Sequence, residues 1–175
     1  MKTKRLTEIG FLTTIALIIF VIELQIPPLV AIPGIKLGLA NVITVYALYK
    51  YSKIEILCII FVRVLLGSIF SGNIMSIPYS LMGGLFCLLG MEIIKNFVSI
   101  SQLWFCSVIG AICHNIGQIT VAYMIMGKAI FAYFPFMLVS GCVTGFITGK
   151  IAQFVYCRMN TIEELKLMMD LDPES

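Results

Sequence analysis

The segment LWFCSVIGAICHNIGQITVAYMIM, residues Leu103–Met126, decides how this chain folds. A helix needs about 20 mostly apolar residues to cross a membrane, and this segment supplies them. Near its centre it carries the chain's single histidine, His114, followed by Asn115 and Gln118. Residues four apart share a helix face, so His114 and Gln118 point the same way, with Asn115 nearly beside Gln118. This trio predicts a pocket for a polar small molecule, with interhelical hydrogen bonds as the alternative.

The composition places the whole chain in a membrane. Of its 175 residues, 60% are hydrophobic and 12% are charged, whereas soluble domains have about 25% charged residues. The net charge of +3 is small, and the basic residues are scattered at the ends of apolar runs. These features exclude a nucleic-acid surface and predict an all-α integral membrane protein.

Six apolar runs are candidates for spanning helices. The first is expected to be a retained span, because no small-residue cleavage site follows it. We therefore predict a six-helix transmembrane domain over residues 1–158 and a short cytoplasmic tail over 159–175. In the tail, Thr161 and Glu164 fit the capping box of a brief interfacial helix. The six runs cover residues 8–26, 37–51, 54–71, 74–96, 103–126 and 129–156.

The lysines and arginines predict the orientation. If the N-terminus is cytoplasmic, nine basic residues lie on the cytoplasmic side, and only Lys36 and Lys128 lie outside. Both termini are then cytoplasmic in the cell (inner) membrane. The first outer connection, PPLVAIPG at residues 27–34, cannot be a regular helix because it holds three prolines. It is either a lid over the bundle or a plain tight connection.

Arg63 is a full charge at the midpoint of the third apolar run. Such a charge is costly at membrane depth and is kept for function or for a local partner. It predicts an anion site or a counter-charge in a central cavity. The alternative is a structural ion pair with Glu23 or Glu92, or a clamp of backbone carbonyl oxygens around the guanidinium.

Other motifs concern packing more than chemistry. Gly141, Gly145 and Gly149 form a small-xxx-small face, which suits close packing within the bundle or against a partner protein. The six cysteines lie in or at the end of apolar runs without CxxC spacing, so we expect reduced packing residues. One histidine without a nearby carboxylate makes a poor metal site. We expect no metal, no cofactor and no catalytic residue.

Four motifs carry a resemblance to a known family. In chain order they are PGIKLGLAN (Pro33–Asn41), RVLLGSIFSG (Arg63–Gly72), YSLMGGL (Tyr79–Leu85) and GAICHNIGQ (Gly110–Gln118). Together they resemble the Gx transporter family, which is also named heptaprenyl diphosphate synthase component I. That family is similar to the substrate-binding S components of energy-coupling-factor transporters, which are six-helix membrane proteins with an outward pocket.

The resemblance implies a substrate-binding set and a function. The set is Arg63, His114, Asn115 and Gln118, joined by Lys36 and Asn41 from the first motif. The implied function is a non-enzymatic subunit that binds a small molecule from outside and takes part in its uptake, with an energy-coupling module as partner.

Two alternatives stay open. One is an accessory subunit for isoprenoid or quinone synthesis, with a soluble synthase subunit as partner. It could not catalyse chain elongation alone, because the only aspartates are Asp170 and Asp172 and magnesium diphosphate sites need carboxylates. The other is a structural subunit of a membrane redox complex. In each case we expect membrane lipid around the protein and no nucleic-acid partner.

Overall fold

The computed structural model describes residues 2–26 and 36–171, and all its regular elements are helical. The 27–34 segment, a possible lid, lies outside the described residues. The elements are α1 (Lys2–Glu23), α2 (Asn41–Leu48), α3 (Lys53–Ser71), α4 (Ser76–Ile94), η1 (Ile100–Gln102), α5 (Leu103–Met126), η2 (Gly127–Tyr133) and α6 (Phe134–Leu171).

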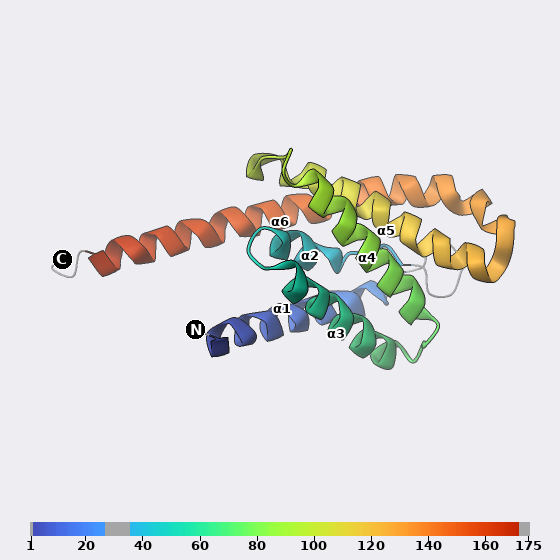
Figure 1. The fold of residues 1–175 in the computed structure, drawn as a ribbon, viewed down its shortest axis with the longest axis horizontal. Helices are drawn as coiled ribbons and strands as arrows, with labels where there is room; N and C mark the ends of the chain where they lie inside the picture. The colour runs from blue at the N-terminus through green and yellow to red at the C-terminus, as the bar shows by residue number, and fades with distance from the viewer. Residues whose placement is uncertain (1, 27–35, 172–175) are drawn as a thin grey trace.

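The helices pack lengthwise around a short central one. α4 lies along α5, α5 lies along α6, and α1 lies along α3. The turn between α5 and α6 is η2 (Figure 1). The short helix α2 contacts each of the other five α-helices, and all eight of its residues are buried. The bundle is therefore built around α2.

The second apolar run does not form the long helix that the sequence predicts. With eight residues, α2 is about 12 Å long, against about 30 Å for the hydrocarbon core of a bilayer. The chain nevertheless crosses the bundle here, because Gly38 bonds Glu23 at one end of α1 and Tyr51 bonds Glu8 near the other. α1 and α3 consequently run in the same direction (Figure 1).

Four described segments are long and apolar enough to cross a membrane. The last holds α5, η2 and most of α6, which fold back on one another, so it is not a single span. The predicted count of six spans is not confirmed by these segments. They are Thr3–Glu23, Lys53–Ser71, Ser76–Ile94 and Ile100–Ile162.

The distribution of burial is that of a membrane protein. Phe11, Phe70 and Phe136 are each at least 66% exposed, whereas Arg63 and His114 are at most 4% exposed. In water this arrangement would be unfavourable, since apolar surface is driven inward and charges outward. In lipid the exposed phenylalanines are solvated and the charges are shielded by protein.

Local sequence sets the ends of the helices. Ser52 and Glu55 form a reciprocal capping box at the start of α3, and Gly72 ends it in the left-handed conformation with φ of 62°. The separate tail helix predicted from Thr161 and Glu164 is wrong. α6 continues unbroken to Leu171, and the Thr161 hydroxyl donates to the Cys157 carbonyl oxygen within the same helix.

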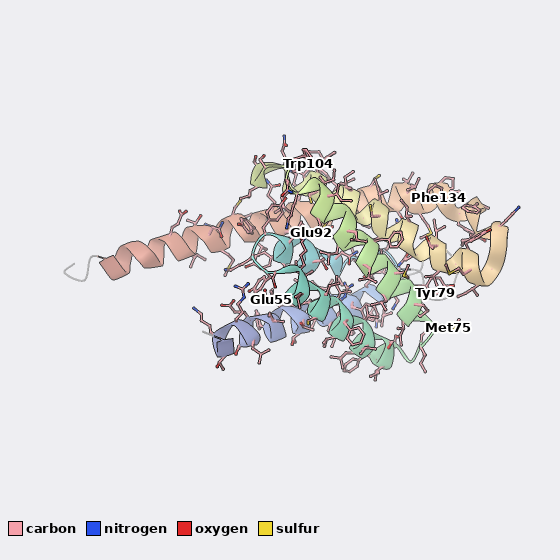
Figure 2. All side chains as sticks on the ribbon, viewed as in Figure 1. Glu55, Met75, Tyr79, Glu92, Trp104 and Phe134 are labelled. Atoms are coloured by element: carbon pink, nitrogen blue, oxygen red, sulfur yellow. The ribbon has the colours of Figure 1, made fainter. Side chains whose placement is uncertain are left out.

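Ion pairs cluster at the end of the bundle that carries both termini (Figures 1 and 2). Arg5 on α1 binds Glu55 on α3 at 2.7 Å. Glu92 on α4 binds Lys53 at 3.0 Å and Lys95 at 2.8 Å. These pairs tie α1, α3 and α4 together where the helices leave the apolar layer.

The glycines of α6 lie directly against α5. An added Cβ at Gly145 would be 2.8 Å from Cα of Val108, and one at Gly149 would be 2.5 Å from Cα of Trp104. Close backbone approach of this kind is the usual reason for small residues between membrane helices. This glycine face therefore serves packing inside the bundle.

Gly149→Ala is expected to destabilise the protein by about 1–3 kcal/mol, because its methyl group would press on the backbone of α5. Gly10→Ala is the matched control, since a Cβ at Gly10 meets nothing within 4 Å and alanine favours helix. Thermal unfolding of both variants in one detergent checks this. Equal melting temperatures for the two would contradict it.

Candidate functional site

A small pocket lined by charged, polar and apolar residues lies between the helices, beside the end of α1. Its walls come from α1, the 36–40 connection, α3, α4 and α5. Its free space is tight, about enough for one water molecule. The lining residues are Phe20, Glu23, Lys36, Gly38, Ala40, Arg63, Val64, Ser80, His114 and Gln118.

Arg63 is buried in this pocket with few partners. Its Nη1 and Nη2 donate to Oδ1 of Asn41 at 3.4 and 3.5 Å, both long for such bonds. A guanidinium has five N–H donors, so these two bonds use only part of its donor capacity. Of the two carboxylates predicted as partners, Glu92 binds lysines elsewhere. Glu23 lines the same pocket, yet no direct ion pair joins it to Arg63 among the described residues.

Lys36 and Glu23 face the pocket from the end of α1 and the connection that follows. Nζ of Lys36 lies 3.7 Å from the centre of the Phe20 ring and has no hydrogen-bond partner in the described part of the chain. Oε1 of Glu23 accepts a 2.6 Å bond from the backbone N–H of Gly38. Gly38 has φ of 81°, a conformation that side chains rarely adopt. Glu23 therefore holds the connection that carries Lys36.

His114 and Gln118 meet as their spacing predicts, with their Nε2 atoms 3.0 Å apart. Two nitrogens can bond only if one donates and the other accepts. If the amide donates, the imidazole proton is on Nδ1; if the amide is turned, Nε2–H donates to its oxygen. In either arrangement the other ring nitrogen and the other terminal amide atom are left over, one as a donor and one as an acceptor. Nδ1 of His114 and Oε1 of Gln118 are indeed buried without a partner among the described residues.

Two glycines make room for the imidazole. An added Cβ at Gly83 of α4 would lie 2.6 Å from Cε1 of His114. One at Gly38 would lie 3.1 Å from Cδ2 of the same ring. His114 therefore occupies a slot between α4 and the 36–40 connection, which only side-chain-free positions allow.

Asn115 lies elsewhere. Its amide is buried and donates to the backbone carbonyl oxygen of Met137 on α6. One residue is a rotation of about 100° on a helix, which carries Asn115 away from the pocket that His114 lines. The structure thus brings four of the predicted residues to one pocket: Arg63, His114, Gln118 and Lys36. Asn41 accepts bonds from Arg63, whereas Asn115 lies at the α5–α6 contact.

The formal charges of the pocket side chains sum to +1. Arg63 and Lys36 contribute two positive charges and Glu23 one negative charge, with His114 counted as neutral. Glu23, Phe20 and Ser80 were not among the predicted site residues. Glu23 had a visible signal, since it is the only carboxylate at the end of the first apolar run. No cluster of three His, Cys, Asp or Glu residues suited to a metal occurs in the described residues.

The comparisons with known proteins identify a family. A family model described as "Heptaprenyl diphosphate synthase component I" matches residues 12–155, which is most of the chain. Searches of curated proteins and of solved structures give no match.

The Lys36 ammonium should make stability depend on pH. Burial lowers the pKa of Lys36 from 10.5 to about 8, and the nearby Glu23 opposes this shift. Between those values the unfolded chain binds more protons, so the free energy of unfolding should rise with pH from 8 to 10, by less than about 1.4 kcal/mol per unit. Lys36→Gln should flatten this rise. Denaturation at several pH values tests it, and an equal flattening by Lys128→Gln, at an exposed lysine, would refute it.

Proposed function

Because the chain belongs to the heptaprenyl diphosphate synthase component I family, we propose that it is a non-catalytic membrane subunit working with a soluble prenyl diphosphate synthase. The family match over residues 12–155 carries this proposal. The chemistry of the chain supports the division of labour. Prenyl elongation holds Mg²⁺ and diphosphate on carboxylates, and both aspartates of this chain lie in its last six residues. The elongating subunit must therefore supply the aspartates.

The shape of the bundle offers a place for a soluble partner. α6 has 38 residues and is about 57 Å long, well beyond the thickness of the hydrocarbon core, about 30 Å. Its apolar segment ends at Ile162, and the rest of the helix projects from the bundle on the side of both termini (Figure 1). By the distribution of basic residues this side is cytoplasmic. A prenyl diphosphate synthase docked there would release its apolar product next to lipid.

A second candidate function is uptake of a small molecule, as in S components. The observation that favours it is the pocket itself, which gathers Arg63, His114, Gln118 and Lys36 at the end of α1 away from both termini. A subunit that only anchors a synthase has no need of buried, unsatisfied polar groups. Six crossings of the membrane, with α2 and its flanks as the second, would complete this architecture.

The synthase partnership is tested by purifying the tagged full-length protein from its native membranes in a mild detergent. An aspartate-rich synthase should co-purify, and prenyl elongation should require that partner. Charge reversal at Arg158, an exposed residue of α6 close to its projecting part, should release the synthase. Arg63→Gln, inside the bundle, is the control and should retain it. Recovery of no synthase, together with unchanged membrane elongation when this chain is deleted, would contradict the proposal.

Uptake is tested by native mass spectrometry of the same preparation. A small molecule bound in the pocket should appear as an added mass that Arg63→Gln loses and Lys128→Gln keeps. His114→Ala should lose it as well. If both pocket variants retain the added mass, the ligand lies elsewhere and the uptake role fails.

A further inference from the structure

The three charged side chains of the pocket lack direct ion-pair partners among the described residues. Arg63 and Glu23 are 4% and 5% exposed, and Lys36 is partly buried beside them. Charges removed from water need direct partners. Yet among the described residues no ion pair joins Glu23 to either cation, and Glu23 spends one oxygen on the Gly38 N–H. The carboxylate therefore does not complete the coordination of the two cations.

The two cations have donors to spare in the same space. Arg63 makes two long bonds to a single amide oxygen. Lys36 rests its ammonium on the face of Phe20 without any hydrogen bond in the described part of the chain. Gln118, which is fully buried, lines the same pocket, and its amide oxygen Oε1 has no partner among the described residues. The spare N–H groups of Arg63 and Lys36 match the oxygens of a carboxylate or a phosphate, which Arg binds with two parallel bonds.

We propose that the pocket binds one singly charged oxyanion group between Arg63 and Lys36, and that Glu23 limits the bound charge to one. One added negative charge brings the net +1 of the pocket to zero, the most favourable total in a medium of low dielectric constant. A group with two or more negative charges would leave the pocket with a net negative charge beside the Glu23 carboxylate.

The present space fits about one water molecule, so a bound oxyanion requires a local movement. Lys36 is the side chain suited to make it, because in the described part of the chain its ammonium contacts the Phe20 ring and makes no hydrogen bond. The Gly38 backbone beside it stays tied to Glu23. The ammonium can therefore turn from the ring to the oxyanion while the connection keeps its place.

This inference rests on the pocket being a ligand site, as in the second candidate function, and it is independent of any synthase. The test is thermal unfolding of the purified full-length protein in a non-ionic detergent at constant ionic strength. The probes are acetate, octanoate and inorganic diphosphate, with chloride as the reference salt. A ligand of the native state raises the melting temperature with its concentration.

Acetate or octanoate should stabilise the native protein. Stabilisation by both probes indicates that the site binds a small free anion. Stabilisation by octanoate alone indicates that it binds the head group of an amphiphile. Lys36→Gln and Arg63→Gln should each weaken the affinity for the anion at least about tenfold, which corresponds to the loss of one charged hydrogen bond. The anion concentration needed for a given rise in melting temperature should increase by the same factor. Lys128→Gln, which removes the same charge from an exposed lysine, should respond like the native protein.

Glu23→Gln tests the role of Glu23 in limiting the bound charge. It also tests the proposed site if Arg63→Gln does not fold. Glutamine can still accept from Gly38, but the pocket then carries +2, so diphosphate should stabilise this variant more than the native protein. The inference is overturned if no probe stabilises the native protein, or if Lys128→Gln loses as much response as Lys36→Gln. It is also overturned if Glu23→Gln leaves the order of the probes unchanged.

Discussion

The central constraint on this bundle is the burial of one guanidinium, that of Arg63, in an apolar environment. Placing the Arg63 charge at membrane depth costs about 3 kcal/mol on insertion scales and more without water nearby. The cost is met by enclosing Arg63 among helices, with the Asn41 amide of α2 against it and Glu23 across the same pocket. The short helix α2, which supplies this amide, is buried along its whole length and contacts each of the other five α-helices.

The hydropathy of the chain predicted α3, α4 and α5 to within two residues at each end, the bounds of α1 and α6 less closely, and the central helix α2 poorly. The predicted 103–126 and 54–71 runs match α5 and α3 to within one residue. The 37–51 run became an eight-residue helix, because apolar residues face protein as readily as lipid and hydropathy does not distinguish the two. Gly38, with its positive φ, adds a turn before Asn41 that composition does not reveal. In the tail, nothing between Lys150 and Leu171 breaks a helix, so Thr161 stays inside α6.

The candidate site was partly predictable for a simple geometric reason. Spacing of four residues places His114 and Gln118 on one face, and depth along the helix places Arg63 at their level. Asn115 shares the sequence neighbourhood but not the face, so it holds α6 instead. Glu23 is the residue that sequence reasoning undervalued as part of the site. A charge at the end of an apolar run resembles an interfacial anchor, and only the return of the chain through Gly38 encloses it.

The chain belongs to the heptaprenyl diphosphate synthase component I family, and the pocket at the end of α1 is the proposed binding site. The proposed synthase contact and the proposed anion site are compatible, since they lie at opposite ends of the bundle along the direction of α1. The most direct measurement is an experimental structure of the native protein in acetate. Density for an oxyanion that contacts both Arg63 and Lys36 is expected. A direct ion pair between Arg63 and Glu23, with no density between the two cations, would contradict it.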